Sequence, residues 1–480
     1  MPRFFLFVSL GCLVTPVTVF AQGETYDRPE TIRRVENIES QINDISQTLW
    51  EYSETALLEY QSAEYLALLL EEQGFAVERG VAEMPTAFVA SFGSGDPIIG
   101  ILAEYDALPG VGNDIVPHRS QRPDGVSSGQ GCGHNLFAAG SIGGAIAVKE
   151  MMEAFDIPGT IRLYGTPAEE TVVGKVYMAK AGLFDDLDAA IHWHPDLRNE
   201  VFNNPGRAMN NFTVEFTGQA AHASADPWNG RSALDAVEMM NYGVNMMREH
   251  IQPSTRIHYV IPSAGEAPNV VPEYAKVWYY VRDLTRESVD TYYARILAVA
   301  EGAALATRTE HQVSLITGVH ETLLNRPLQE SLQQILESVG APDFTDEDNE
   351  FARSLQEFLE IAEVGLATNV IPLADEPGPA SGGSTDVAEV SYITPTVGFS
   401  ITTAAAGIPW HSWATSASHG TEAARKSAVN AGKVIALGVM EMLTNEALLQ
   451  AARADFEQRT GGEAYRSPIP ADQAPPVPQR

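Results

Sequence analysis

Three short segments that carry metal-binding side chains constrain the fold of this chain more than any other feature. They are residues 131–135 (GCGHN), the pair Glu169-Glu170 and residues 192–195 (HWHP), and each lies next to an apolar run. Glycines on both sides of Cys132 leave the backbone free to direct Cys132 and His134 toward one point. Thiolate, imidazole and carboxylate groups are the donors that Zn²⁺ prefers. We therefore expect a fold that brings these segments together around a metal site.

The apolar runs beside these segments indicate buried strands that alternate with helices. Residues 98–103 (IIGILA) are almost entirely apolar, which is typical of a central strand, and Glu104 and Asp106 follow directly. Ligands gather at the carboxyl ends of strands in open α/β sheets. The alternation therefore predicts a three-layer α/β domain. Its further expected strands are 160–165 and 189–193, and its expected helices are 30–50, 54–72 and 135–155.

The pattern changes near residue 206, where a second domain is expected. Residues 206–320 show the order β-α-β-β-α-β, which predicts a small four-stranded domain inserted into the larger one. The catalytic domain would then consist of residues 27–205 and 321–450, with late helices near 327–339, 350–363 and 421–443. The Pro-rich end, residues 467–480, is predicted to be disordered.

The N-terminus predicts export. A basic start, an apolar run over residues 4–20 and Ala21 at the cleavage position form a secretory signal peptide, residues 1–21. The run is too short for a confident membrane span, so we expect a secreted, periplasmic protein with no span after cleavage. The formal net charge of −33 argues against nucleic acid as a partner.

Removal of the signal peptide leaves Cys132 as the one cysteine, so no intramolecular disulfide can form. Cys132 is then either a buried apolar thiol or a metal thiolate. The neighbouring donors favour the metal thiolate.

The motifs of the chain resemble those of the M20 metallopeptidase and amidohydrolase family. The resemblance is greatest for its branch of N-acyl-amino-acid, indole-conjugate and aminobenzoyl-glutamate hydrolases. The motifs that carry it occur in the family's order and are residues 103–109 (AEYDALP), 131–135, 166–170, 218–222, 269–272 with Arg282, and 410–413 (WHSW). The resemblance implies a zinc-peptidase-like catalytic domain with an inserted lid and dimerisation domain, and a homodimer as the assembly.

The resemblance also implies a pair of divalent cations, Zn or Mn, as cofactor. It assigns metal-ligand roles to Cys132, which takes the place of a bridging carboxylate, and to His134, Glu170, His194 and His411.

Other roles follow from the same resemblance. Glu169 would be the general base, and Asp106 would lie behind a metal ligand. His222 would stabilise the oxyanion, acting across a dimer interface, and Asn269 and Arg282 would bind a substrate carboxylate. Where other M20 branches have a histidine ligand, this chain has Glu104.

Two histidine pairs leave alternatives. His192 and His194 lie on one face of the same strand, so geometry alone does not choose between them. Alignment with the motifs of the family favours His194 as the metal ligand. His192 would then lie behind the metal ligands and contact them rather than the metal. His419 competes more weakly with His411 and is expected at a helix start.

We therefore expect an exported, metal-dependent amidohydrolase that cleaves an N-acyl or N-aroyl amino acid, or a short peptide, with metal-activated water. One rival is a periplasmic ligand- or metal-binding protein with the same fold and no catalysis. Another is a cysteine hydrolase that uses Cys132 and a histidine, but no Asn or Asp orienter at a recognisable spacing supports it.

Overall fold

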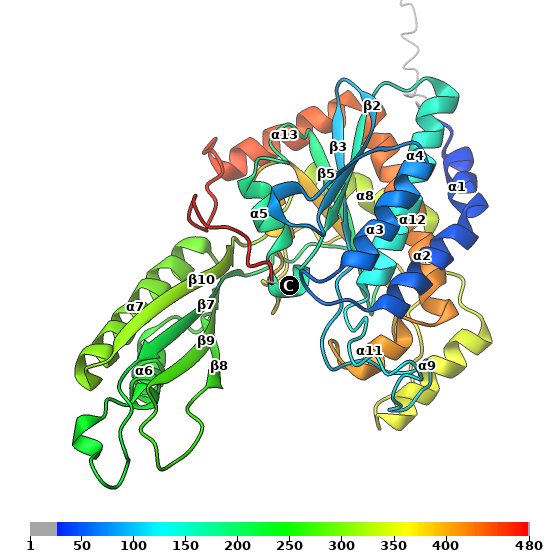
Figure 1. The fold of residues 1–480 in the computed structure, drawn as a ribbon. Coiled ribbons are helices and arrows are strands. Elements are labelled where there is room, and N and C mark those ends of the chain that lie inside the picture. The colour runs from blue at the N-terminus through cyan, green and yellow to red at the C-terminus, as the bar shows by residue number, and fades with distance from the viewer. Residues whose placement is uncertain (1–25, 479–480) are drawn as a thin grey trace, which may run out of the picture.

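The computed structural model describes residues 26–478, so the predicted signal peptide lies outside the described residues. The larger domain contains a seven-stranded sheet in the order β1-β2-β4-β3-β5-β11-β6 (Figure 1). Strands β3, β4, β5 and β11 are parallel to one another, whereas β1, β2 and β6 run antiparallel to their neighbours. The strands are β1 (Ala76–Arg79), β2 (Phe88–Ser94), β3 (Ile98–Glu104), β4 (Gly159–Thr166), β5 (Ala189–Asp196), β6 (Glu200–Val201) and β11 (Thr396–Thr402).

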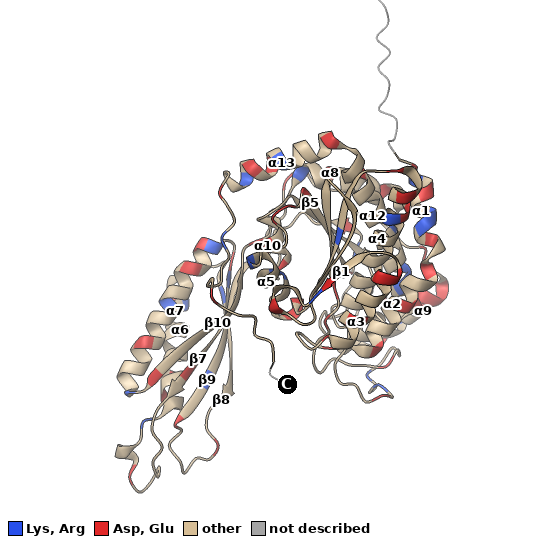
Figure 2. Cartoon of the chain, turned by 45° about the horizontal axis from the view of Figure 1, so that its top comes forward, with Lys and Arg blue, Asp and Glu red and all other residues tan. Residues whose placement is uncertain are grey.

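Two long helices, α4 (His134–Phe155) and α12 (Glu422–Thr444), pack side by side on one face of this sheet. Glycines in α4 permit this close approach, because a side chain at either position would crowd the backbone of α12. A Cβ at Gly140 would lie 2.9 Å from the carbonyl oxygen of Ala428, and a Cβ at Gly144 would lie 3.1 Å from the carbonyl oxygen of Gly432. The short helices α5 (Gly174–Lys180) and α10 (Val387–Ser391) contact each other on the opposite side of the sheet (Figures 1 and 2). The predicted three-layer architecture is confirmed. Outer helices are α1 (Arg28–Asn37), α2 (Glu39–Tyr52), α3 (Tyr60–Glu72), α8 (Arg326–Val339), α9 (Asp346–Phe358), α11 (Trp413–Ser418) and α13 (Glu446–Thr460).

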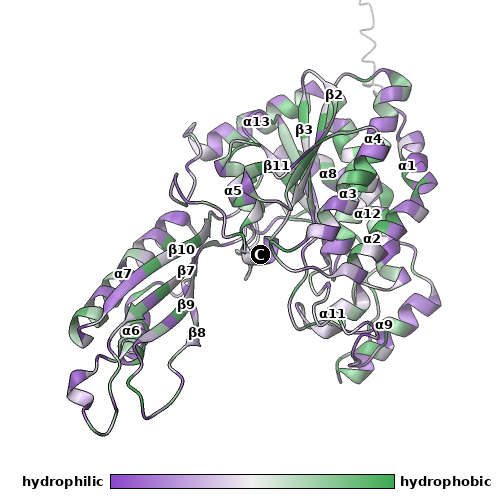
Figure 3. Ribbon diagram, viewed as in Figure 1, coloured by the Kyte–Doolittle hydropathy of each residue, from purple (hydrophilic) through white to green (hydrophobic). Residues whose placement is uncertain are grey.

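The inserted domain projects away from the sheet as a separate lobe (Figure 1). Its antiparallel sheet has the order β10-β7-β9-β8 and its own apolar core against α6 and α7. Hydropathy alternates along its strands, with green and purple residues following one another in Figure 3. The order of elements matches the predicted β-α-β-β-α-β pattern. The elements are β7 (Ala208–Thr217), α6 (Ala233–Met247), β8 (Arg256–Ser263), β9 (Tyr274–Asp283), α7 (Arg286–Thr307) and β10 (Glu310–Val319).

The N-terminal helices differ from the sequence prediction. The expected helix 30–50 is divided at Ile38, whose φ and ψ of −108° and 16° are not helical. The expected helix 54–72 begins only at Tyr60, because Leu57 adopts a left-handed conformation with a φ of 61° and Thr55 pairs with Ala107. Apolar periodicity continues through both interruptions, so it did not reveal them.

The C-terminal end also differs from the prediction. Helix α13 was not predicted, and it extends the second part of the catalytic domain beyond residue 450. Residues 467–478, which were expected to be disordered, follow a defined path over α5 and β10. Ile469 is buried there, and Gln473 donates hydrogen bonds to both domains.

Among residues 26–478, no single helix has the length and apolar composition of a membrane span. Helices α12 and α13 together meet both criteria, but the pair is bent by 93° between them.

Candidate metal centre

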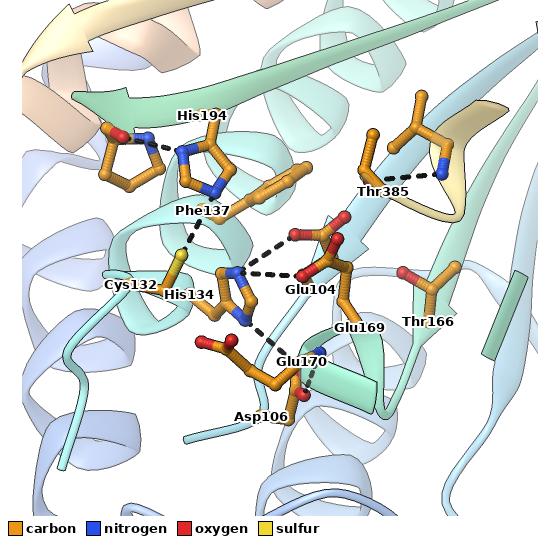
Figure 4. A network of polar contacts seen from close by, with 12 residues as sticks. Glu104, Asp106, Cys132, His134, Phe137, Thr166, Glu169, Glu170, His194 and Thr385 are labelled. Carbon is orange, nitrogen blue, oxygen red and sulfur yellow. Dashed lines mark hydrogen bonds and ion pairs between the residues drawn. The ribbon is translucent and has the colours of Figure 1, made fainter. Parts of the chain in front are cut away.

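The candidate site lies at the carboxyl ends of three parallel strands (Figure 4). Glu104 is the last residue of β3, Glu169 lies in the turn after β4, and His194 is near the end of β5. Because parallel strands end at the same edge of a sheet, these side chains meet although they are far apart in the chain. The location is the one that the sequence predicted.

Cys132 is the centre of this cluster. Gly133 adopts a left-handed conformation with a φ of 87°, which sharply turns the chain into α4 and places Cys132 and His134 together. The Sγ of Cys132 lies 3.4 Å from the Nε2 of His194 and 3.3 Å from the Nε2 of His411. Two candidate donor groups share this sulfur: Cys132 with His134 and His194, and Cys132 with Glu170 and His411. The five predicted ligands therefore converge.

Asp106 orients His134 from behind. Its Oδ1 lies 2.8 Å from the Nδ1 of His134, while its Oδ2 accepts a hydrogen bond of 2.9 Å from the backbone N–H of Glu170. The Nε2 of His134 is thereby directed toward the centre. An outer carboxylate that fixes the tautomer of a histidine ligand is common in metal sites.

The adjacent glutamates point in different directions because the turn between them is tight. Ala168 and Val172 both have a positive φ, 58° and 55°, at the two ends of this turn. Glu169 points toward His134, with 3.9 Å between Oε2 and Nε2, whereas Glu170 Oε2 lies 3.6 Å from His411 Nε2. Burial, and then the charges of Glu104 and Asp386, raise the pKa of Glu169 well above its ordinary value. A carboxyl group with a raised pKa suits proton transfer near neutral pH.

Two of the predicted histidine ligands, His194 and His411, are kept neutral, whereas the charges of Cys132, Asp106 and Glu104 outweigh burial and raise the pKa of His134 well above its ordinary value. Burial, followed by the charges of His134 and His194, lowers the pKa of His411 to about 4. Burial and the charge of His134 also lower the pKa of His194. Neutral imidazoles have a free electron pair, which is the form that binds metal.

The rival histidines occupy different places. His192 packs between Phe137 and Phe202 and belongs to no candidate donor group among residues 26–478. His419 is buried, with its Nδ1 2.6 Å from the carbonyl oxygen of Gln130 and its Nε2 3.1 Å from the Oγ1 of Thr403. The structure thus brings His194 and His411, rather than His192 and His419, beside Cys132.

Comparison with known proteins decides the family. The sequence profile of peptidase family M20/M25/M40 matches residues 100–470. The chain belongs to this family. It is 36% identical to one of the subunits of p-aminobenzoyl-glutamate hydrolase from Escherichia coli, over 90% of this chain and 95% of the relative. It is 26% identical to Xaa-Arg dipeptidase of Mus musculus, over 88% of this chain and 90% of the relative. It is thus a member of an enzyme family whose named relatives hydrolyse amide bonds.

Solved structures of M20 proteins share the fold. An aminobenzoyl-glutamate utilization protein from Klebsiella pneumoniae superposes with a TM-score of 0.59 at 18% identity, covering 84% of this chain and 97% of that one. A dinuclear metal-binding peptidase of the M20 family from Bacillus subtilis superposes with a TM-score of 0.54 at 17% identity, covering 83% of this chain and 99% of that one.

A cavity of about 690 Å³ opens beside the M20 donors. Cys132, Glu169, His194 and His411 lie in its wall, together with apolar side chains such as Phe202. Among residues 26–478, no Lys or Arg lines this cavity. The apolar residues of the wall are Val201, Phe202, Leu323, Leu324, Ile371, Pro372, Leu373, Ala374, Val387, Val397 and Trp410.

The three predicted site residues of the inserted domain lie in different places. Arg282, on β9, is half-buried. Burial lowers the pKa of its guanidinium, and the charges of Tyr280 and then Glu169 partly oppose this, so Arg282 lies within electrostatic range of the centre. Its Nε has no hydrogen-bond partner among residues 26–478. His222 and Asn269 are exposed, follow β7 and β8, and do not line the cavity of their own chain.

Two buried residues near the centre were missed by the sequence analysis. Lys175 lies at the start of α5, with its Nζ 2.7 Å from Glu104 and 2.6 Å from Asp386. Glu59 accepts a hydrogen bond of 2.9 Å from the backbone N–H of Ala168, beside the general-base candidate. The one local signal for these two residues in the sequence was the position of Lys175, five residues after Glu170 in a largely apolar segment.

Proposed function

We propose that this M20 protein is a metal-dependent amidohydrolase that releases an amino acid from an N-acyl or N-aroyl amino acid or from a short peptide. The observation that carries the proposal is the convergence of two donor groups on Cys132. Each group combines the sulfur with nitrogen or oxygen donors, as Zn²⁺ sites do.

The donor set fits a pair of cations. Burial, and then the charge of Glu170, raise the pKa of the Cys132 thiol, so without a cation it stays neutral. Glu170 Oε1 is buried and has no hydrogen-bond partner among residues 26–478. Buried polar atoms of this kind are costly unless something pairs with them, and a cation would do so. When bound, such a cation lowers the pKa of water and polarises the amide carbonyl.

The residues of the chain supply the remaining steps. Glu169 would take the proton from the attacking water and return it to the leaving amine. Asp106 would hold the ring of His134 in place during both transfers. Arg282 would bind the free carboxylate of the substrate, for which its planar guanidinium is suited.

The site would be completed by a second copy of the chain. His222, the candidate for oxyanion stabilisation, is exposed and follows β7, whose C-terminal end points away from the catalytic domain in Figure 1. Large apolar side chains are exposed on α6 and on the edge strand β8, which suits an interface. They are Met239, Tyr242, Met246, Val260 and Ile261. We therefore propose a homodimer in which the inserted domain of one copy serves the centre of the other.

Two substrate classes are candidates. The named relatives act on p-aminobenzoyl-glutamate or are Xaa-Arg dipeptidases. An aroyl group would fit the apolar wall around Phe202. The cavity also has Asp196, Glu200 and Glu376 in its wall and no Lys or Arg among residues 26–478, which favours a basic side chain as the second candidate.

The proposed location is the periplasm, reached through the signal peptide at residues 1–21.

Metal analysis coupled to a substrate screen tests the proposal. The purified protein should contain up to two divalent cations per chain and should hydrolyse N-acyl amino acids, aminobenzoyl-glutamate or Xaa-Arg dipeptides. Chelation should abolish turnover, and Zn²⁺, Mn²⁺ or Co²⁺ should restore it. Binding without turnover after metal addition would instead favour the non-catalytic binding protein, and chelator-resistant activity blocked by a thiol reagent would favour a cysteine hydrolase.

A further inference from the structure

A buried carboxyl group, that of Glu59, lies behind the turn that carries the general-base candidate, and no step of the proposed reaction uses it. Glu59 is 0% exposed and directly precedes α3. A side chain at this position often accepts a hydrogen bond from the first turn of its own helix, but the side chain of Glu59 makes none. Its Oε1 instead accepts a hydrogen bond of 2.9 Å from the backbone N–H of Ala168, 109 positions later in the chain.

The start of α3 does not need the side chain of Glu59, because Glu54 satisfies the backbone donors there. Oε1 of Glu54 accepts a hydrogen bond of 3.1 Å from the backbone N–H of Gln61, and its Oε2 accepts one of 2.8 Å from the backbone N–H of Ser62. The carboxyl group of Glu59 is therefore available to the turn after β4. Its contact with Ala168 stabilises that turn rather than its own helix.

The turn after β4 needs such a contact. Ala168 is fully buried and adopts a left-handed conformation with a φ of 58°. This conformation is unfavourable for a residue with a Cβ, so it persists only where neighbouring groups fix it. Pro167 has no N–H, so the N–H of Ala168 is the first backbone donor after β4. Glu59 thus holds the turn at the point where the chain leaves the strand.

Glu169 lies between two backbone groups that buried acids hold. On one side, Glu59 accepts the hydrogen bond from Ala168. On the other side, Asp106 Oδ2 accepts a hydrogen bond of 2.9 Å from the backbone N–H of Glu170 (Figure 4). Among the described residues, Glu59 belongs to no candidate donor group. Its effect on the centre therefore passes through the backbone of the turn.

The carboxyl group of Glu59 is mostly neutral at neutral pH. Burial, and then the charge of Asp106, raise the pKa of Glu59 to about 8. A neutral carboxyl group and the side-chain amide of glutamine have the same shape, and each has a carbonyl oxygen that accepts a hydrogen bond. The variant Glu59→Gln should therefore keep the contact with Ala168, whereas Glu59→Ala should lose it.

We propose that Glu59 is a positioning residue for the general base, because its hydrogen bond to Ala168 fixes the turn that directs the carboxylate of Glu169 toward the attacking water. The inference rests on the role of Glu169 in the proposed function. Misplacement of a catalytic group by about 1 Å can lower the rate by about 100-fold. Loss of the contact should therefore reduce kcat. Metal affinity should change little, because Asp106 still holds the N–H of Glu170.

Kinetics and hydrogen exchange of the metal-loaded, full-length protein test this inference. Wild type, Glu59→Ala and Glu59→Gln would be assayed with p-aminobenzoyl-glutamate, an N-acyl amino acid and an Xaa-Arg dipeptide. We expect Glu59→Ala to lower kcat by about 10-fold to 100-fold, with KM and metal content near the wild-type values. Glu59→Gln should keep most of the activity. Amide exchange in peptides that span residues 167–173, measured by mass spectrometry, should be faster in Glu59→Ala and close to wild type in Glu59→Gln.

A double-mutant cycle separates positioning of the base from a general structural role. In the Glu169→Gln background no base is left to misplace, so the addition of Glu59→Ala should change the residual rate little. A merely structural role would lower the rate by the same factor in both backgrounds. Asp348→Ala is the matched control, because Asp348 is a buried acid that accepts a hydrogen bond of 2.8 Å from the backbone N–H of Thr345 beside α9. It should leave kcat and the exchange of residues 167–173 unchanged.

Three results would overturn the inference while the proposed function stands. They are a wild-type kcat in Glu59→Ala, unchanged exchange at residues 167–173, and equal rate losses in both backgrounds. Should Glu59→Ala not fold, Glu59→Asp should show the same losses, because its shorter side chain withdraws the oxygen from Ala168. Wild-type behaviour of Glu59→Asp would then overturn the inference equally. A wild type that hydrolyses none of the three substrates would instead remove the proposed function and the inference together.

Discussion

The Sγ of Cys132 lies 3.3 Å from the Nε2 of His411, although the two residues are 279 positions apart in the chain. His411 reaches this place from a loop after β11, in a left-handed conformation with a φ of 55°. Non-glycine residues adopt this conformation at a cost, and it is often found at functional sites. The contact joins the two parts of the catalytic domain across the inserted domain, so the centre exists only when both parts have folded together.

Replacing Glu169 by Gln should abolish turnover and leave metal binding intact. Glutamine cannot take a proton, and loss of a general base typically costs about 10²–10⁴-fold in rate. Metal content should stay near the wild-type value, because Glu169 belongs to neither of the two groups that contain Cys132, although it forms a third candidate group with Glu104 and His134. The kcat and the metal content of Glu169→Gln, measured on the same preparation, check this. Full activity in the variant would refute the mechanism.

Replacing His222 by Ala should reduce kcat far more than metal content, because His222 is remote from the donors of its own chain. If the partner copy supplies this histidine, mixing His222→Ala with Glu169→Gln should restore activity. Random reassortment makes half of the dimers mixed, each with one complete site, so about a quarter of the wild-type activity should return. Exchange of protomers followed by an activity assay checks this. No recovery after verified exchange would contradict the composite site.

Glu59 should make the metal-free protein less stable as the pH rises. Burial, and then the charge of Asp106, raise the pKa of Glu59 from 4.5 to about 8. A raised folded-state pKa contributes stability that is complete below pH 4.5 and is lost as the pH rises toward 8. At about 1.4 kcal/mol for each pKa unit, the loss attributable to Glu59 between pH 5 and pH 8 is at most about 4 kcal/mol.

The variant Glu59→Gln should lack this part of the pH dependence. Urea unfolding of chelator-treated wild type and variant at pH 5 and pH 8 measures it, with the exposed Glu72→Gln as control. Parallel loss of stability in wild type and Glu59→Gln would show that another group is responsible.

The C-terminal segment should stabilise the contact between the two domains. The side-chain amide of Gln473 donates to the hydroxyl of Tyr177 in α5 and to the carbonyl oxygens of Leu315 and Ile316 in β10. At about 0.5–1.5 kcal/mol for a hydrogen bond, Gln473→Ala should destabilise by about 1–3 kcal/mol. Deletion of residues 464–480 should cost more, since it also exposes the site of Ile469.

Calorimetric unfolding and hydrogen exchange at β10 measure the effect of this segment. Gln450→Ala is the control, because the side-chain amide of Gln450 contacts Glu446 on its own helix. Unchanged exchange at β10 after the deletion would show that the segment does not hold the domains together.

Much of the catalytic domain was predictable because its signals are local. The apolar run before Glu104 is typical of a buried strand, and the glycines beside Cys132 allow the chain to turn sharply. The order of elements in the inserted domain followed from alternation and helical periodicity in the same way. The break at Ile38 and the path of residues 467–478 were not predictable, because packing against distant residues decides both.

The sequence by itself determined which donor side chains end strands or begin helices, because the spacing of apolar residues and glycines sets local structure. Only the tertiary structure decided which donors meet. His192 and His194 share a strand face but lie about 6.6 Å apart along it, so the position of Cys132 selects between them. Lys175 acquires its partners, Glu104 and Asp386, only when α5 packs against the strand ends, and His222 is carried away from its own centre by the inserted domain. Contacts of this range depend on how helices pack on a sheet, and no local pattern in the chain encodes them.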